Sequence, residues 1–330
     1  YTRKDMESWA EVVARMACAG GAQAGDIAQI AFGYGLFTGA FGLHFGLQRL
    51  GAAVIPLSSG NTQRQIKIMH ELGTTVLVST PSYALYLAEV AESMGLSEQL
   101  KLRIALFGGE GHSEPMRKTI EDKLRIAVTE NYGLSEIIGP GVAGECLHKQ
   151  GMHLAEDHFI PEIINPDTGE VLPIGQTGEL VLTTITKEGL PMLRYRTRDI
   201  TRLIPGTCAC GRTSVRLAKM QGRSDDMLVV RGVNVFPSQI EEIVLQTEGI
   251  GPHYEIVVSR KNYLDVLEVL VEPKEARLLE RFSELEKLEQ TLRTKLKTAL
   301  SVEAKVRLVE PASLKRFEGK AKRVTDLRKT

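Results

Sequence analysis

The sequence predicts an α/β protein, with a large α/β domain, a β-rich subdomain and a small C-terminal α+β domain. Short apolar runs alternate with helical patterns in the first half. After about residue 140, Pro, Gly and Thr punctuate short strands, and a compact mixture of strands and helices follows Gly222. Strand, helix, strand in this order predicts a parallel sheet that binds ligands at the carboxyl ends of its strands.

The first half supplies the elements of this sheet. Runs of strand length that end near Gly, Ser or Pro cover residues 53–57, 75–79 and 102–107. Apolar residues recur at intervals of three and four in residues 63–72 and 82–94, which predicts two helices.

The second half predicts a mostly antiparallel subdomain and then a small domain. The predicted strands of the subdomain include residues 178–184 and 192–195. In the small domain we expect a β-rich stretch at 227–235, a helix at 238–246, strands at 255–259 and 264–271, and a long charged helix at 276–300.

Composition narrows the class of protein. The 330 residues carry 41 Lys plus Arg and 41 Asp plus Glu, so the formal net charge is zero. No overall electrostatic field therefore favours binding to nucleic acid or to an anionic membrane. The longest apolar stretches are interrupted before the ~20 residues of a membrane span. No secretory signal is visible, and four cysteines are too few for a disulfide framework, so we expect a cytoplasmic protein. A homodimer is left open.

The segment Asn131–Glu136 follows an apolar run that ends near Val128. An aromatic residue, a glycine, a hydroxyl and a carboxylate at a strand end would place a stacking surface beside a metal ligand. The alternative is a strand-to-loop turn capped by Ser135 and Glu136.

The segment Leu193–Asp199 places three arginines around one aspartate. Guanidinium groups bind anions and a carboxylate accepts hydrogen bonds from paired hydroxyls, so this pattern suits a phosphate and a ribose. A strand with a solvated ion-pair face is the alternative.

Two further segments lie toward the C-terminus. Gly222–Met227 is a polar run where the composition changes between domains, which suits a hinge or a plain linker. Phe317–Lys320 carries a lysine after a glycine in a basic tail. Such a lysine can be presented to an anionic transition state, or the tail is simply solvated.

Taken in order, these segments resemble the adenylate-forming superfamily, and most closely the phenylacetate–CoA ligase family. The motifs that carry the resemblance are YGLSE, YRTRD, GRSDDMLVVRGVNVFPSQIE and EGK. The resemblance runs across essentially the whole chain. It implies that an aryl-acetic acid is activated with ATP and Mg²⁺ as an acyl-adenylate, and that the acyl group then passes to the thiol of coenzyme A.

The resemblance also assigns roles to residues. It implies that Glu136 is the magnesium-associated carboxylate and that Asp199 holds the ribose hydroxyls. Lys320 would stabilise adenylate formation, and a hinge at Asp225 would join a large domain (1–222) to a lid (223–330). The nucleotide-binding residues implied by the resemblance are Gly108, Gly109, Glu110, Asn131, Tyr132, Gly133, Ser135, Asp199, Arg223 and Lys320.

An aryl pocket is predicted around the segment Phe32–Gly39, where aromatic residues interleave with glycines that give a ring room to approach. For Tyr34 and Leu36 a packed helix start is the alternative. The lining residues implied by family likeness are Phe32, Phe37, Gly108, Asn131 and Pro140.

The family places a phosphate loop rich in Ser, Thr and Gly before the point where this chain starts. Ser58–Thr62 offers hydroxyls and a glycine, but its position leads us to interpret it as a strand-to-helix cap. The chain opens with Tyr1 rather than Met, so we expect a fragment or a processed product that lacks part of the ATP site.

The cysteines suggest a structural zinc site. Cys208 and Cys210 form a Cys-x-Cys-Gly turn, and Cys146 lies near His148 and His153. Three thiolates and one imidazole would close a tetrahedral site, with His153 preferred over His148. A pair of reduced thiols in a turn is the alternative.

Three other functions are kept as alternatives. The acyl acceptor could be the thiol of a carrier protein, the chain could bind a nucleotide or acyl ligand without catalysis, or it could be a zinc-stabilised scaffold. Thioester formation with free coenzyme A, pyrophosphate exchange and metal analysis distinguish these alternatives.

Overall fold

The fold was analysed in a computed structural model that describes residues 1–35, 38–261, 264–275, 278 and 281–329. The described residues form two compact units. Unit 1 comprises Tyr1–Gly111, Thr119–Ser224 and Glu318–Lys320. Unit 2 comprises His112–Lys118, Asp225–Phe317 and the residues from Ala321 onward.

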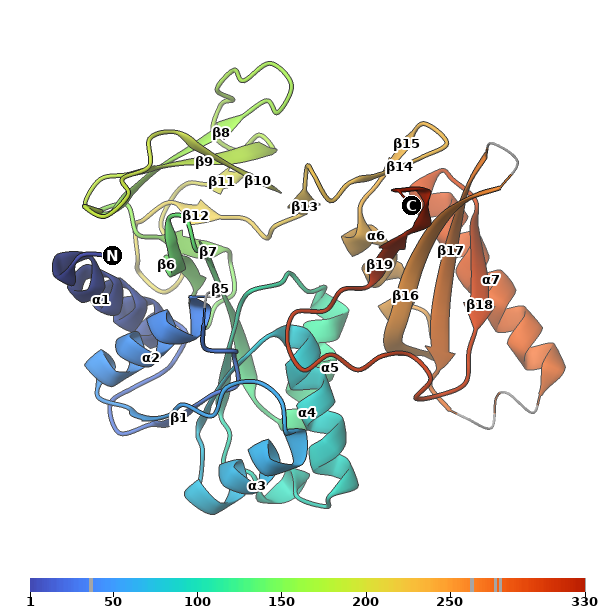
Figure 1. The fold of residues 1–330 in the computed structure, drawn as a ribbon, viewed down its shortest axis with the longest axis horizontal. Coiled ribbons are helices and arrows are strands. Elements are labelled where there is room, and N and C mark those ends of the chain that lie inside the picture. Colours follow the sequence, from blue (N-terminus) through green and yellow to red (C-terminus); the bar gives the residue numbers. More distant parts are fainter. Residues whose placement is uncertain (36–37, 262–263, 276–277, 279–280, 330) are drawn as a thin grey trace. The chain divides into compact units, whose positions relative to one another are not determined.

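The larger sheet of unit 1 runs in the order β11-β12-β7-β6-β5-β4-β3-β1-β2 among the described strands. Figure 1 labels β1, β5, β6, β7 and β12 of this sheet. Its parallel part consists of β1 (Ile27–Ile30), β2 (Ala53–Ile55), β3 (Val76–Ser79), β4 (Ile104–Phe107) and the start of β5 (Ala127–Leu134). Its antiparallel part adds β6 (Ile138–Glu145), β7 (Met152–Leu154), β11 (Leu203–Ile204) and β12 (Arg216–Leu217). The predicted parallel sheet is therefore confirmed.

Helices connect the parallel strands. They are α2 (Gly39–Leu50), α3 (Thr62–Leu72), α4 (Pro81–Ser93) and α5 (Glu114–Leu124), with a short 3₁₀ helix η1 (Ser97–Gln99), while α1 (Arg3–Ala19) precedes β1. Helix α4 begins where Thr80 accepts a hydrogen bond from the amide of Tyr83 and Pro81 occupies the first turn. Helices α1 and α2 pack so closely that a Cβ at Gly46 would lie only 2.3 Å from a methyl carbon of Val13.

The second sheet of unit 1 has the order β13-β10-β9-β8 and is antiparallel, as predicted. Its strands are β8 (Phe159–Ile164), β9 (Gly178–Thr184), β10 (Tyr195–Thr201) and β13 (Gly222–Arg223). Strand β9 has the predicted bounds. Strand β10 does not match the predicted 192–195, because Arg194 adopts a positive φ of 46° that interrupts an extended chain just before Tyr195.

Unit 2 is the predicted α+β module. A hairpin of β14 (Leu228–Val230) and β15 (Val233–Val235) is followed by α6 (Pro237–Leu245). The main sheet, in the order β18-β17-β16-β19, contains β16 (Ile250–Lys261), β17 (Leu264–Pro273), β18 (Ala304–Leu308) and β19 (Val324–Asp326). The remaining elements are α7 (Phe282–Leu300) and η3 (Leu327–Lys329). The long helix expected at 276–300 is described only from residue 282, and residues 276–277 and 279–280 lie outside the described residues.

A buried polar pair supports the loop between β2 and α3. Gln29 and Gln65 are fully buried, and Nε2 of Gln29 donates to Oε1 of Gln65 over 2.6 Å. Nε2 of Gln65 in turn donates to the carbonyl oxygens of Ser58 (2.6 Å) and Gly60 (3.2 Å). The loop backbone is thus held from inside the unit.

Among the helices that the structure describes, none combines the length and the apolar character that crossing a bilayer requires.

Candidate active site

The carboxyl ends of β4 and β5 bring two predicted nucleotide-binding segments together. Because Phe107 pairs with Glu130 in parallel register, Gly108 follows beside Asn131. A Cβ at Gly108 would lie only 2.5 Å from Oδ1 of Asn131, so the approach requires glycine. Asn131 is 7% exposed, and its Nδ2 has no hydrogen-bond partner among the described residues. A buried amide donor left in this way is suited to a bound ligand.

Strand β5 extends further than the sequence predicted. We expected the strand to end near Val128 and Asn131–Glu136 to leave it. Instead Asn131 and Tyr132 pair with Gly144 and Ala143 of β6, so their backbone groups are satisfied in a sheet. The alternative of a loop turn applies only to Ser135 and Glu136.

The second glycine of the β4 loop and its carboxylate have a structural function. Gly109 has a positive φ of 81°, and Glu110 accepts a hydrogen bond of 2.7 Å from the amide of Ser82 in the first turn of α4. A carboxylate at a helix N-terminus is favourable. The role of Glu110 beside adenine stays a prediction.

Tyr132 connects β5 to the Arg-rich strand β10. Its hydroxyl donates to Oδ2 of Asp199 over 2.6 Å, and Nη1 of Arg223 lies 3.9 Å from Oδ1 of the same carboxylate. Burial and then the charge of Asp199 raise the pKa of Tyr132 well above its usual value, so the hydroxyl remains a donor. The structure therefore brings together Tyr132, Asp199 and Arg223, which the sequence placed in three separate segments.

The bend of β10 directs Asp199. The register with β9 shifts between Arg196 and Ile200, and Arg198 has a positive φ of 68°. Irregularities of this kind re-aim a side chain and are common at functional sites. No sequence pattern indicated this bulge, because arginine does not favour a positive φ.

Ser135 and Glu136 lie exposed on the turn between β5 and β6. Oγ of Ser135 is 3.4 Å from Oγ1 of Thr38, which itself donates to the carbonyl of Gly139. Burial and then the charge of Glu136 raise the pKa of Tyr195, which shows that this carboxylate acts on β10. The carboxylate of Glu136 and the hydroxyls of Ser135 and of Thr38, the residue before α2, are oxygen groups of the kind that Mg²⁺ binds.

The predicted aryl-pocket residues are only partly assembled. Phe32 is 3% exposed within the main core of unit 1, and Phe37 lies outside the described residues. Pro140 follows a cis peptide bond, and a Cβ at Gly133 would lie 2.7 Å from its Cα. Tyr34 precedes α2 and hydrogen-bonds with Nδ1 of His44 over 3.1 Å, which agrees with a packed helix start. The role of this set in binding an aryl ring stays a prediction.

The lysine segment belongs to unit 1 although the chain around it belongs to unit 2. Thr62 donates to Oε1 of Glu318 over 2.7 Å, and Thr80 donates to the carbonyl of Gly319 over 3.1 Å. Lys320 itself is exposed. The loop Ser58–Thr62 was interpreted only as a helix cap, but Asn61 makes no capping hydrogen bond through its side chain. Sequence reasoning therefore missed Thr62 and Thr80, for which the one signal was their place after predicted strands.

Asp225 is exposed and is the first residue of the second compact unit after Ser224. This division lies two residues beyond the predicted boundary at 222/223. The hinge function of Asp225 and the two domains as functional parts stay predictions.

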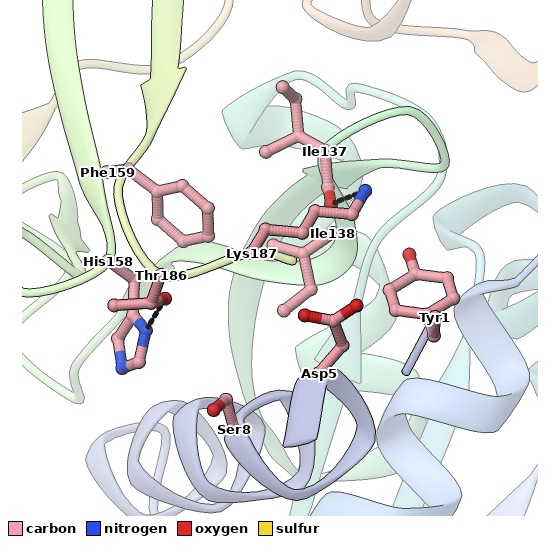
Figure 2. A pocket seen from close by; sticks show the side chains of 9 residues that line it. All are labelled: Tyr1, Asp5, Ser8, Ile137, Ile138, His158, Phe159, Thr186 and Lys187. Carbon is pink, nitrogen blue, oxygen red and sulfur yellow. Dashed lines mark hydrogen bonds between the residues drawn. The ribbon is translucent and has the colours of Figure 1, made fainter. Parts of the chain in front are cut away.

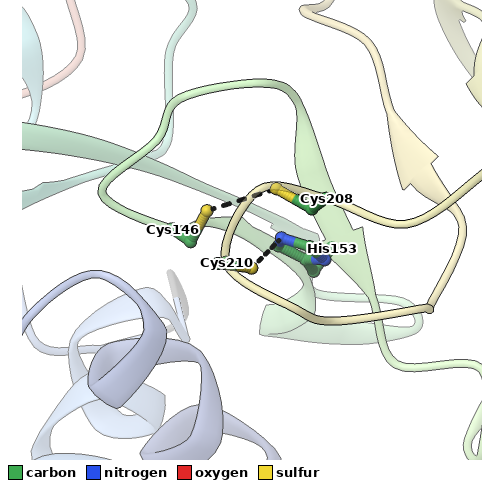
Figure 3. Close-up of side chains that lie close together, drawn as sticks. All are labelled: Cys146, His153, Cys208 and Cys210. Atoms are coloured by element: carbon green, nitrogen blue, oxygen red, sulfur yellow. Dashed lines mark hydrogen bonds between the residues drawn. The ribbon is translucent and has the colours of Figure 1, made fainter.

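A separate cluster contains the predicted metal ligands (Figure 3). The ligand atoms of Cys146, His153, Cys208 and Cys210 all lie within 4.8 Å of one another. Sγ of Cys146 is 3.8 Å from Sγ of Cys208, and Sγ of Cys210 is 3.4 Å from Nε2 of His153. A tetrahedron with Zn–S bonds of ~2.3 Å has edges of about 3.8 Å, so the spacing fits zinc.

The groups around the cluster match this interpretation. His153 uses Nδ1 to contact Oγ of Ser214 at 3.2 Å, which leaves Nε2 directed to the thiols. His148 is exposed and is not part of the cluster.

A pocket of about 300 Å³, including space open to solvent, lies behind the β5–β6 turn (Figure 2). Lys187, Ile137 and Ile138 form one side of it, and Asp5 and Tyr1 form another. Its lining contains none of the predicted nucleotide or aryl residues. It is therefore separate from the candidate active site.

Comparison with known proteins identifies the family. Residues 19–186 match the AMP-binding enzyme family, and residues 232–328 match the AMP-binding enzyme C-terminal domain. The phenylacetate-coenzyme A ligase of Pseudomonas putida is 48% identical over 99% of this chain and 74% of its own length. The enzyme of that name from Escherichia coli is 46% identical over 99% of this chain and 75% of its own length. The chain belongs to the phenylacetate–coenzyme A ligase family.

The fold of this ligase family member agrees with solved structures. The crystal structure of 2-hydroxyisobutyryl-CoA ligase in the postadenylation state, in complex with 2-HIB-AMP, has a TM-score of 0.93 and 30% sequence identity. That comparison covers 99% of this chain and 70% of the other chain. The predicted resemblance and the predicted adenylate-forming fold are both confirmed.

Proposed function

We propose that this phenylacetate–coenzyme A ligase family member converts phenylacetate, or a related aryl acid, to its CoA thioester. A carboxylate oxygen of the acid attacks the α-phosphorus of ATP, and the bond to pyrophosphate breaks. The CoA thiol then attacks the acyl carbon, and AMP leaves. The observation that carries the proposal is the identity of 46–48% with phenylacetate-coenzyme A ligases over 99% of the chain.

The site geometry supports a nucleotide at the ends of β4 and β5. The unpartnered amide of Asn131 beside Gly108 suits an adenine edge, with Tyr132 alongside. Asp199 carries one hydrogen bond from Tyr132 and would accept the ribose hydroxyls, while Arg223 supplies positive charge to a phosphate. The backbone around this proposed nucleotide site is formed by Gly109, Glu110, Gly133 and Ser135.

Glu136 is assigned to Mg²⁺. Its exposed carboxylate and the hydroxyls of Ser135 and Thr38 provide the hard oxygen atoms that this ion prefers beside phosphates. When bound, Mg²⁺ neutralises charge on the phosphoryl oxygens. The protein's part is to hold the carboxylate in place.

Lys320 is assigned to the first half-reaction. Its ammonium would stabilise the charge that builds on phosphoryl oxygens during adenylate formation. The hydrogen bonds of Glu318 with Thr62 and of Gly319 with Thr80 support a defined position for the segment in unit 1. A rotation about Asp225 would then withdraw Lys320 for thiol transfer.

The cluster of Cys146, His153, Cys208 and Cys210 is assigned to a structural zinc ion. Its ligands come from strand β7 and two loops of unit 1, outside the nucleotide-binding residues. Four protein ligands leave no open position, which is typical of structural rather than catalytic zinc. The cytoplasmic location and the homodimer also stay predictions.

The function is tested with the protein expressed from its complete reading frame. We expect phenylacetate to stimulate exchange of labelled pyrophosphate into ATP, and CoA to be consumed only when phenylacetate and ATP are both present. AMP binding by calorimetry without exchange would instead favour a non-catalytic binding protein. Exchange without use of free CoA would favour a carrier-protein thiol as the acceptor.

A further inference from the structure

Lys187 lies in the segment after β9 and contacts the turn between β5 and β6. Its Nζ donates to the carbonyl oxygen of Glu136 over 2.8 Å and to that of Ile137 over 2.6 Å (Figure 2). One ammonium group therefore holds two consecutive carbonyls of the turn that carries the candidate magnesium ligand. Neither the sequence motifs nor the proposed function assigns a role to this lysine.

The surroundings of Lys187 are enclosed and charged. Nζ lies 4.9 Å from the centre of the Tyr1 ring, within the range of a cation–π contact. Burial lowers the pKa of Lys187, while the carboxylates of Asp5 and Glu136 act in the opposite direction. The ammonium thus interacts electrostatically with two carboxylates and donates to two main-chain carbonyls.

Asp5 fixes the backbone that carries Lys187. Its carboxylate, which is 5% exposed, accepts amide hydrogen bonds of 2.8 Å from Glu188 and from Gly189. A Cβ at Gly189 would lie 2.8 Å from Oδ2 of Asp5, so the close approach depends on glycine. Helix α1 therefore anchors the segment, and less backbone conformational entropy is lost when the lysine reaches the turn.

We propose that Lys187 is a positioning residue that orients the Glu136 carboxylate toward Mg²⁺ by holding the main chain of the β5–β6 turn. This inference rests on the proposed function, which assigns Glu136 to that ion. Groups behind a metal ligand commonly fix its orientation.

The charge of Lys187 and its hydrogen bonds have opposite effects on a cation at Glu136. A lysine that acted only as a nearby positive charge would repel Mg²⁺, so its removal would strengthen binding. A lysine that positions the turn would weaken binding when removed. The sign of the change therefore distinguishes the two functions.

The first test does not require activity. In Lys187→Met, we expect amide hydrogen exchange of a peptide covering residues 135–139 to become on the order of tenfold faster without ligands, because the turn opens more often. The amide of Ile137, which donates to the carbonyl of Leu134 over 3.1 Å, reports on this opening. Lys4→Met is the matched control, since Lys4 makes an exposed ion pair with Glu188 and does not contact the turn. Unchanged exchange in Lys187→Met would overturn the proposal.

The second test measures the Mg²⁺ concentration that gives half-maximal pyrophosphate exchange. Lys187→Met should raise it on the order of tenfold, as expected for a group behind a metal ligand, and the KM for phenylacetate should change little. Lys187→Arg, which retains several donors, should recover part of the loss. An unchanged or lower Mg²⁺ requirement in Lys187→Met contradicts the proposal.

The failure of this inference can be distinguished from failure of the proposed function. If the unmodified protein shows no acid-dependent exchange, the proposed function fails, while hydrogen exchange still reports whether Lys187 holds the turn. If Lys187→Met does not fold, Lys187→Gln supplies the same two measurements with a neutral donor of shorter reach. The exchange rate and the Mg²⁺ requirement of Lys187→Gln should lie between those of the unmodified protein and those expected for complete loss of the lysine contacts. Values equal to those of the unmodified protein would contradict the proposal.

Discussion

Gly108 shows how one missing side chain shapes the nucleotide end of the sheet. It lies where a parallel register places the β4 loop against Asn131, and there is no room for a Cβ. The amide that has no hydrogen-bond partner in the described part of the chain is on the same asparagine. A change at this glycine therefore tests the site without removing any functional group.

We expect Gly108→Ala to weaken AMP binding on the order of tenfold, because a Cβ 2.5 Å from Oδ1 of Asn131 must displace that amide. Calorimetry with AMP measures the change. Gly111→Ala is the control, since a Cβ at Gly111 would meet nothing within 4 Å. Equal affinities of the two variants would argue against a nucleotide at Asn131.

Asp5 gives a prediction for the dependence of stability on pH. Burial opposes its ionisation, but amide hydrogen bonds from Glu188, Thr2 and Gly189 outweigh it and lower the pKa of Asp5. Because the folded-state pKa lies below the unfolded value of about 3.9, the stabilisation is complete above that pH. It is lost as the pH falls through the folded-state pKa.

Asp5→Asn should accordingly lower the free energy of unfolding by about 2 kcal/mol at pH 7. Its difference in stability from the unmodified protein should shrink below pH 4. Fluorescence of Trp9, the one tryptophan of the chain, follows urea unfolding of this helix. Glu7→Gln, on an exposed position of α1, serves as the control. A constant difference from pH 7 to pH 3 would contradict the assignment.

At the scale of elements, one strand and two loops that are distant in sequence converge on the cysteine cluster. Strand β7 supplies His153, Cys146 follows β6, and the segment between β11 and β12 supplies Cys208 and Cys210. A bound ion would therefore connect one edge of the large sheet with the segment that follows β11.

We expect the protein to contain about one zinc per chain by elemental analysis, and Cys208→Ser to lose it together with several degrees of thermal stability. Cys18→Ser is the control, because Cys18 is exposed and outside the cluster. A metal-free protein with an unchanged melting temperature in Cys208→Ser would reject the zinc site.

Local patterns predicted some elements better than others. Helix α3 follows from apolar residues that recur at intervals of three and four. Strand β9 follows from the Pro, Gly and Thr residues that punctuate the short strands of the subdomain. The extension of β5 through Asn131 could not be predicted, because the polar side chains give no strand pattern although the backbone pairs with β6. The bulge at Arg198 and the hydrogen bond from Tyr132 to Asp199 depend on tertiary contacts that no short segment encodes.

At the scale of the whole molecule, the assignment of Lys320 predicts different effects on the two half-reactions. Lys320→Ala should slow adenylate formation by a factor of roughly 10² to 10³, while thioester formation from supplied acyl-adenylate and CoA changes little. The two rates are measured separately by pyrophosphate exchange and by CoA consumption. Lys322→Ala, at an exposed lysine two residues further along the chain, is the control.

Equal losses in both half-reactions would show that Lys320 does not act on adenylation alone. Full exchange activity in Lys320→Ala would reject its assignment altogether. The motif predicted this lysine, but its placement with unit 1 follows from the hydroxyls of Thr62 and Thr80.

The buried pair of Gln29 and Gln65 affects how the molecule responds to its substrates. Because Gln65 already fixes the carbonyls of Ser58 and Gly60, the loop that leads to Thr62 is ordered when the chain folds. This loop loses its conformational freedom during folding, before any substrate binds. Substrate binding should therefore show little heat-capacity change from ordering of the loop.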